Sequence, residues 1–180
     1  MVSDAESLEV IRNRIKDYPD FPKPGVLFRD IFTLFHEPKL VNSIVSMMAD
    51  HISKTHGQVD IIAGIESRGF LFAVPLSLQL SLPFVPIRKK GKLPGETENI
   101  DFQLEYGTDT LEIQKNSIKN GQKVVIIDDL LATGGTLDGS CKLVEKVGGI
   151  VSTCLIVMEL LALKGRAKIN TPLHSLLKYP

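Results

Sequence analysis

The chain has 180 residues, 21 basic and 21 acidic side chains, and 43% hydrophobic residues. This length suits one domain, and zero net charge argues against binding of nucleic acids or anionic membranes, which needs a basic surplus. The apolar stretches are too short to span a membrane, the first residues are polar, and Cys141 and Cys154 are too few for a disulfide framework. We therefore expect one cytoplasmic domain over residues 1–180, with no nucleic-acid or membrane partner.

The hydrophobic pattern predicts two kinds of structure in chain order. Helical spacing of Leu8, Ile11 and Ile15 predicts a helix over residues 6–16, and the prolines and glycine of residues 21–31 predict an extended, turning segment. Further along, we expect helix 40–52, strand 59–65, helix 69–80, strand 84–87, strand 124–127, helix 136–147, strand 150–158 and a last strand after residue 170. Strands and helices that alternate in this way predict an α/β fold with a mostly parallel central sheet flanked by helices.

The segment between residues 91 and 115 does not follow this alternation. Two β-like pieces, 102–106 and 110–113, flank the sequence Gly-Thr-Asp at residues 107–109, which predicts a long hairpin projecting from the sheet. Long insertions in compact domains are usually functional. We therefore predict a mobile lid over about residues 95–114.

The strongest local signal is VVIIDDLLATGGT at residues 124–136. Its strand delivers Asp128 and Asp129 at the carboxyl end, where open α/β sheets bind ligands. Two threonines and two glycines then precede a helix, so that hydroxyls, backbone N–H groups and the helix N-terminus form a phosphate cradle. The stretch lacks the Lys of a Walker A motif and the spacing of a dinucleotide site. A ribose 5-phosphate fits both parts, with its phosphate in the cradle and its hydroxyls on the two carboxylates.

Four other features are less specific when taken alone. Residues 66–69, Glu-Ser-Arg-Gly, open a helix and indicate either a second anion site or a capped helix with Arg68 on a surface carboxylate. The basic run at residues 88–92 is typical of a solvated loop. Phe28 by itself indicates a core aromatic, and Glu105 by itself an exposed carboxylate.

Five blocks of sequence carry a resemblance to a known family. DDLLATGGT at residues 128–136 resembles the phosphoribosyl pyrophosphate motif of the type I phosphoribosyltransferases, which by itself indicates only that superfamily. The other blocks are similar to its adenine-specific members: FPKPGVLFRDI at 21–31, GIESRGF at 64–70, IRKKGKLPG at 87–95 and LEYG at 104–107. Together they imply a single-domain type I phosphoribosyltransferase fold, with an N-terminal hood over residues 1–35 and a core over 36–180.

The resemblance implies an activity and its partners. The expected reaction transfers 5-phosphoribosyl from phosphoribosyl pyrophosphate to adenine, forming AMP and pyrophosphate through an oxocarbenium-like transition state in purine salvage. The implied cofactor is Mg²⁺, held through pyrophosphate, ribose and water, with no direct protein ligand. A homodimer is also implied, in which Arg88 reaches a pyrophosphate across the interface.

The resemblance also assigns roles to individual residues. Glu105 in the lid is the expected acid–base at the purine imidazole ring, Tyr106 helps to exclude water, and Arg68 stabilises the departing pyrophosphate. Residues 66–69 are expected to hold that pyrophosphate on a strained, cis peptide bond. Phe28 and Leu131 are expected to enclose the purine. The implied substrate-binding residues are Leu27, Phe28, Arg29, Glu66, Ser67, Arg88, Lys92, Asp128, Asp129, Leu131, Ala132, Thr133, Gly134, Gly135 and Thr136.

Two alternative functions remain open in the sequence. The same chemistry on hypoxanthine, guanine, xanthine or orotate is disfavoured because each base presents a different hydrogen-bond edge to the hood. A ligand-sensing regulator that has lost catalysis needs a DNA-binding element or another output surface. The neutral charge, the short N-terminal helix and Glu105 in a complete lid favour an enzyme.

Overall fold

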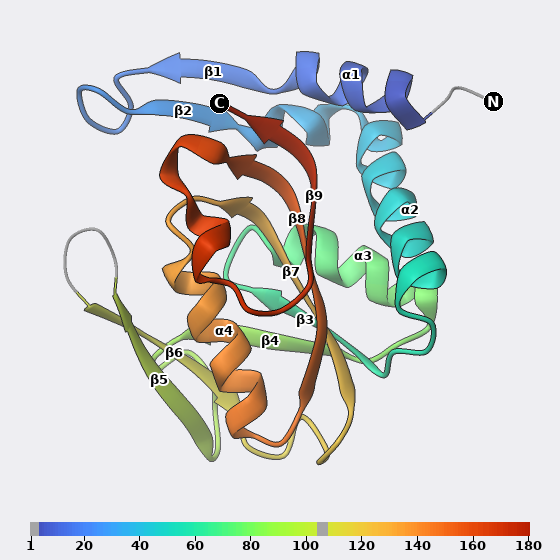
Figure 1. Cartoon of the computed structure of the whole chain (residues 1–180), viewed down its shortest axis with the longest axis vertical. Helices are drawn as coiled ribbons and strands as arrows, with labels where there is room; N and C mark the ends of the chain where they lie inside the picture. Colours follow the sequence, from blue (N-terminus) through green and yellow to red (C-terminus); the bar gives the residue numbers. More distant parts are fainter. Residues whose placement is uncertain (1–3, 104–107) are drawn as a thin grey trace. The chain divides into compact units, whose positions relative to one another are not determined.

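The computed structural model describes residues 4–103 and 108–180 (Figure 1). The chain divides into two compact units, Met1–Met47 and Met48–Pro180. The predicted α/β class is confirmed. The prediction of a single domain, with a hood over residues 1–35 and a core over 36–180, stays a prediction.

The N-terminal unit is built on a short antiparallel pair of strands. After helix α1 (Asp4–Arg14), strand β1 (Lys16–Pro19) pairs with β2 (Leu27–Asp30), and the 3₁₀ helix η1 (Ile31–His36) follows. Asp30 caps η1 by accepting a hydrogen bond from the N–H of Phe32 at 2.9 Å. The predicted helix over residues 6–16 is therefore wrong at its end, because residues 16–19 form a ladder with β2 that helical periodicity does not reveal. Helix α2 (Pro38–Thr55) contains residues of both units.

The second unit holds a seven-stranded sheet in the order β5-β6-β4-β3-β7-β8-β9. Its five strands from β4 to β9 run parallel, and the β5–β6 hairpin adds two antiparallel strands at one edge. The bounds are β3 (Ile61–Ile65), β4 (Phe84–Lys89), β5 (Thr97–Gln103), β6 (Thr108–Gln114), β7 (Lys123–Leu131), β8 (Ile150–Leu160) and β9 (Leu173–Tyr179).

Two helices cover the two faces of this sheet. α3 (Phe70–Leu80) connects β3 to β4 and α4 (Gly135–Lys146) connects β7 to β8, so the chain moves in opposite directions along the sheet in the two crossovers (Figure 1). Because such crossovers are right-handed, the two helices lie on opposite faces. The central strands β3 and β7 are consequently buried on both sides, which explains the apolar runs at residues 61–65 and 124–127. Two short 3₁₀ turns, η2 (Leu161–Leu163) and η3 (Gly165–Lys168), precede β9.

The hairpin and β7 differ in detail from their predictions. The first hairpin strand starts and ends earlier than the predicted 102–106, and the second extends beyond the predicted 110–113 at both ends, because β5 and β6 pair over seven positions from Thr97–Gln114 to Gln103–Thr108. β6 joins β4 through only two residue pairs, which is why the hairpin projects from the sheet edge (Figure 1). β7 continues past its predicted end at residue 127 to Leu131, because that part also pairs with β8. No helix in the described ranges combines the length and apolar character needed to cross a membrane.

Candidate functional site

A cavity of about 250 Å³ lies at the carboxyl ends of β3 and β7. These strands are parallel neighbours, so the loops that follow them meet at one edge of the sheet. The cavity is lined by residues 66–68 after β3 and by residues 128–137 at the end of β7 and the start of α4. The structure thus brings together two motifs that lie about 60 residues apart in sequence and were predicted separately as anion sites.

The predicted phosphate cradle is a tight strand-to-helix turn. β7 ends at Leu131 and α4 begins at Gly135, which leaves only residues 132–134 between them. Gly134 has a φ of +82°, a conformation that glycine adopts without a steric cost. The first N–H groups of α4 have no acceptor within the helix, and residues 134–137 line the cavity, so the N-terminus of α4 favours an anion there.

Of the two carboxylates of the cavity, Asp129 is buried and Asp128 is half-buried. Asp129 is 2% exposed, and its Oδ2 lies 2.9 Å from the Nε of Arg68. Burial raises the pKa of Asp129, and the charge of Arg68 opposes this rise. Burial, and to a smaller extent the charge of Asp129, raise the pKa of Asp128 well above its usual range. A hydroxyl donor in the cavity would relieve both carboxylates, because each would gain a hydrogen bond without a new negative charge.

The Asp129 oxygen at this ion pair still has acceptor capacity. Among the described residues, Asp129 Oδ2 accepts no aligned hydrogen bond, although Arg68 lies within ion-pair distance. Buried polar atoms are nearly always hydrogen-bonded in native proteins. An exposed hydroxyl of a bound ligand is the kind of donor this oxygen lacks.

The loop after β3 is compact. The peptide bond between Glu66 and Ser67 is cis, as the resemblance implied. A Cβ atom at Gly69 would lie 2.6 Å from the carbonyl oxygen of Ile65 and 2.7 Å from that of Ile127, so only glycine fits here. Gly69 therefore lets the loop pass close to β7, which brings Arg68 within reach of Asp129.

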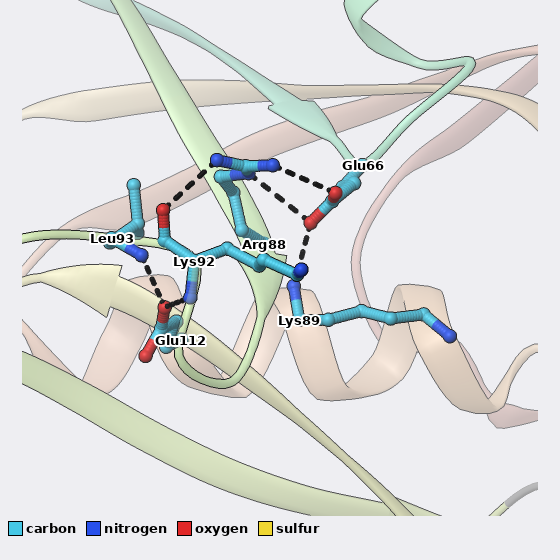
Figure 2. A network of polar contacts seen from close by, with 6 residues as sticks. All are labelled: Glu66, Arg88, Lys89, Lys92, Leu93 and Glu112. Atoms are coloured by element: carbon cyan, nitrogen blue, oxygen red, sulfur yellow. Dashed lines mark hydrogen bonds and ion pairs between the residues drawn. The ribbon is translucent and has the colours of Figure 1, made fainter.

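Glu66 holds a second arginine beside the cavity (Figure 2). The guanidinium of Arg88 donates to both carboxylate oxygens of Glu66, at 3.2 and 2.9 Å, and to the carbonyl of Lys92 at 3.0 Å. The backbone N–H of Lys89 adds a further bond to Glu66 at 3.0 Å. The hydrogen bond from Arg88 accordingly lowers the pKa of Glu66.

Glu112 anchors the basic loop from its other side (Figure 2). Its buried carboxylate accepts hydrogen bonds from the N–H groups of Lys92 and Leu93, both at 2.7 Å. Burial alone would raise the pKa of Glu112, but the backbone donors lower it. Sequence reasoning missed this residue, because a charged residue between Leu111 and Ile113 follows the ordinary alternation of a strand with one solvent face and so gives no sign that Glu112 is buried.

Three of the predicted base-binding residues, Leu27, Phe28 and Arg29, lie in the N-terminal unit, whereas Leu131 is a buried residue of the cavity lining in the second unit. Leu27 is 43% exposed, and Arg29 pairs with Asp17 at 3.8 Å. The ring of Phe28 packs edge-on against Phe21 with centroids 5.1 Å apart. A second cavity, of about 330 Å³, is lined by Tyr18, Phe21, Phe28 and Asp30. Phe28 is thus part of an aromatic cluster at a cavity rather than a fully buried core residue.

Two predicted catalytic residues, Glu105 and Tyr106, lie outside the described residues. Lys92 is exposed, and the cavity lining includes Leu130 and Leu137, which the sequence did not single out. Within the described ranges, no group of three or more His, Cys, Asp or Glu side chains is placed to hold a metal ion.

Comparison with known proteins extends these observations. Residues 33–172 match the phosphoribosyl transferase domain family. The adenine phosphoribosyltransferase of Drosophila pseudoobscura pseudoobscura is 48% identical over 178 residues, which cover 99% of this chain and 98% of that protein.

Two solved structures are also similar. The adenine phosphoribosyltransferase of Thermoanaerobacter pseudethanolicus superimposes with a TM-score of 0.91 at 47% identity, covering 96% of this chain and 99% of the other. The enzyme of Saccharomyces cerevisiae, in complex with adenine and an imino-altritol bisphosphate, superimposes with a TM-score of 0.93 at 41% identity over the same shares.

Proposed function

The chain belongs to the adenine phosphoribosyltransferase family and is a purine-salvage transferase, and we propose that its central cavity transfers the 5-phosphoribosyl group. The donor is phosphoribosyl pyrophosphate, the acceptor is adenine, and the products are AMP and pyrophosphate. The observation that carries this assignment of the site is the meeting of residues 66–68 and 128–137 in one cavity. One loop offers cationic and N–H groups for a pyrophosphate, and the other offers carboxylates and a helix N-terminus for a ribose 5-phosphate.

We assign the ribose 5-phosphate to the phosphate loop. The residues proposed to bind its phosphate are Ala132, Thr133, Gly134, Gly135 and Thr136, through backbone N–H groups and two hydroxyls. Asp128 and Asp129 accept hydrogen bonds from the ribose hydroxyls. The acceptor capacity of Asp129 Oδ2 and the raised pKa values of both carboxylates support this, because hydroxyl donors stabilise the charged forms.

Pyrophosphate departure needs positive charge that is free to move to the leaving group. In the structure, Arg68 pairs with Asp129 and Arg88 pairs with Glu66. We propose that Arg68 transfers its ion pair to the pyrophosphate, which is held by the loop of Glu66 and Ser67, with Lys92 nearby. Developing negative charge on the pyrophosphate then makes this interaction stronger in the transition state than in the ground state.

Mg²⁺ is the proposed cofactor. The donor set fits it in one respect, since two carboxylates beside a polyphosphate site suit a hard cation with oxygen ligands. Asp128 and Asp129 would orient its water, and pyrophosphate and ribose oxygens would complete its coordination. The ion would neutralise charge on the departing pyrophosphate.

The base-binding and acid–base roles are proposals from the resemblance. Leu27 and Arg29 offer backbone groups to the adenine edge, and Phe28 and Leu131 offer apolar surfaces to the ring. Glu105 is the proposed acid–base at the purine imidazole ring, and Tyr106 is proposed to exclude water.

A homodimer and a cytoplasmic location are proposed as well. An exposed apolar face on α3, with Val74 at 38% and Leu78 at 75% exposure, supports a protein partner, since such surfaces are usually covered. The dimer proposal assigns Arg88 to a pyrophosphate across the interface. Leu78→Glu should convert the dimer to a monomer in sedimentation, and a wild-type chain that sediments as a monomer would contradict the proposal.

The test of the function is an initial-rate assay of pyrophosphate release. The assay compares the wild type with Glu105→Gln and Glu96→Gln. Each reaction contains phosphoribosyl pyrophosphate, Mg²⁺ and one base, which is adenine, hypoxanthine, guanine, xanthine or orotate. Glu96 is the matched control, because it belongs to the same hairpin segment and its side chain is 82% exposed.

The outcomes separate the open alternatives. Turnover with adenine alone, lost in Glu105→Gln and kept in Glu96→Gln, would support the substrate and the lid residue together. Turnover on another base would refute the proposed base selectivity while leaving the phosphate loop assignment intact. Binding of phosphoribosyl pyrophosphate without turnover on any base would indicate a regulator.

A further inference from the structure

The back of the phosphate loop rests on a short turn between β8 and β9. η3 lies beside the start of α4 (Figure 1). Gly165, at the start of η3, is buried, and a Cβ atom there would overlap the carbonyl oxygen of Ala132 and lie 2.8 Å from the nitrogen of Gly134. In return, a Cβ atom at Gly134 would overlap the carbonyl oxygen of Gly165. The loop and the turn therefore touch backbone to backbone, with no side chain between them.

Arg166 holds this β8–β9 turn in place. Its Nε and Nη2 donate to the two carboxylate oxygens of Glu159 at 2.8 and 2.6 Å. Its Nη1 donates to the carbonyl of Leu173 at 2.8 Å, and its Nη2 also reaches the hydroxyl of Ser175 at 3.1 Å. Ser175 donates to Glu159 as well, which closes the network. One guanidinium thus ties the turn to both β8 and β9 in the two-pronged geometry that Arg makes and Lys does not.

The other end of this network lies beside the phosphate loop. Glu159 is 2% exposed, and in the sheet register it is the partner of Leu131, the last residue of β7 before the loop. It is also the register partner of Lys178 in β9. The carboxylate therefore sits on the strand next to the root of the loop, and the guanidinium that it holds fixes the turn behind the loop.

The buried charge of Glu159 needs a reason, whereas its partner Arg166 is half-buried. A fully buried carboxylate is stable only when it is paired and hydrogen-bonded, and apolar residues of similar size often stabilise a fold as well or better. None of Glu159, Arg166 and Ser175 lines the cavity of residues 66–68 and 128–137. What the three residues share is that they hold the turn of Gly165, and Gly165 contacts the phosphate loop.

We propose that Arg166, clamped by Glu159 and Ser175, is a positioning residue that presses Gly165 against Ala132 and Gly134 and so holds the phosphate-binding backbone in its binding geometry. The inference rests on the proposed function, because it assigns to this loop the 5-phosphate of the donor. A cradle of N–H groups binds phosphate only when those groups converge on one point, and a displacement of about 1 Å is enough to cost about 100-fold in rate. The clamp supplies that convergence from behind.

The experiment compares three variants with a control in the same turn. Arg166→Lys keeps the charge and loses the fork, Ser175→Ala removes one bond of the network, and Gly165→Ala adds a Cβ at the contact itself. The φ of Gly165 is not in the left-handed region, so the last variant acts through overlap alone. Lys168→Ala, an exposed residue of η3, is the control.

For each variant, KM for phosphoribosyl pyrophosphate and KM for adenine are measured. The binding of inorganic phosphate is measured separately by calorimetry. Arg166→Lys and Gly165→Ala should raise KM for phosphoribosyl pyrophosphate by about 10- to 100-fold and leave KM for adenine unchanged. Ser175→Ala should raise it by a smaller factor, and Lys168→Ala should leave both constants at wild-type values. A variant that only loosens the fold would raise both constants together.

The outcomes decide whether Arg166 positions the phosphate loop. Unchanged KM for phosphoribosyl pyrophosphate in the folded variants, or an equal rise in both constants, would overturn the proposal. If Arg166→Lys and Gly165→Ala fail to fold, Ser175→Ala carries the same test, because it leaves the Arg166–Glu159 pair intact. A wild type with no turnover on any base would refute the proposed function instead, and weakened phosphate binding in Ser175→Ala would then still support the clamp.

Discussion

The adjacent carboxylates at the end of β7 oppose folding while they serve binding, which makes Asp128→Asn an informative change. The substitution keeps the side-chain shape and the oxygen that accepts a bond from the N–H of Asp129 at 2.9 Å, and it removes the charge. The pKa of Asp128 is raised by burial and by Asp129, so its ionised form costs free energy in the folded state. Removing such a cost at a functional site typically stabilises a protein by about 1–2 kcal/mol. For a chain of this length, that gain raises the melting temperature by about 2–8 °C.

The stability gain should depend on pH in a defined direction. A carboxyl group with a raised folded-state pKa binds a proton in the folded protein before it does so in the unfolded chain, so the cost is present at high pH and disappears as the pH falls toward the usual Asp value. The advantage of Asp128→Asn should thus be present at about pH 8 and be lost as the pH falls to the usual Asp value of about 4. Turnover should fall by about 100-fold or more, because an anionic acceptor for the ribose is lost.

Thermal unfolding across this pH range, with Asp50→Asn as control, tests the reasoning. Asp50 is 67% exposed and pairs with Lys54 along the same helix face, so its replacement should change stability by less than about 0.5 kcal/mol. A melting temperature for Asp128→Asn at or below that of the wild type at about pH 8 would refute the electrostatic argument. A stability gain that stays constant down to about pH 4 would also refute it.

The remaining predictions concern the supports of the site. Glu112→Gln should lower the free energy of unfolding by about 1–3 kcal/mol and speed hydrogen exchange of the loop amides that it accepts, and unaltered exchange would contradict its anchoring role. Gly134→Ala should abolish turnover, because the added Cβ would overlap the carbonyl oxygen of Gly165. Gly121 has a similar φ of +81° but open space around it, so Gly121→Ala should remain active. Equal activities of the two variants would refute the steric explanation. Burial and two neighbouring imidazoles lower the pKa of His51 to about 4, so stability should fall as the pH drops from about 6.5 to about 4. In chemical denaturation, His51→Gln should reduce this loss of unfolding free energy by about 1 kcal/mol, and replacement of the exposed His36 by Gln should not. The same dependence of stability on pH in both variants would contradict the prediction.

The alternation of apolar segments was enough to predict the α/β class and most elements of the second unit. Residues 124–127 have no polar side chain, and only a strand covered on both faces explains such a run. The phosphate loop was equally readable, because two glycines and two threonines between a strand and a helix leave few other structures open. Local sequence was less informative where a strand depends on its partner, as β1 shows. Its residues 16–19 carry no β pattern and pair only because β2 lies opposite.

The chemistry of the site likewise divides into a local and a tertiary part. The sequence by itself determined which groups were available, since the carboxylates, the threonines and the glycines of residues 128–136 stand together in the chain. Only the tertiary structure decided how the ions pair, with Arg68 on Asp129, Arg88 on Glu66 and Arg166 on Glu159. Side-chain partners across a parallel sheet depend on strand order and register, and these are set by long-range packing that no local pattern encodes.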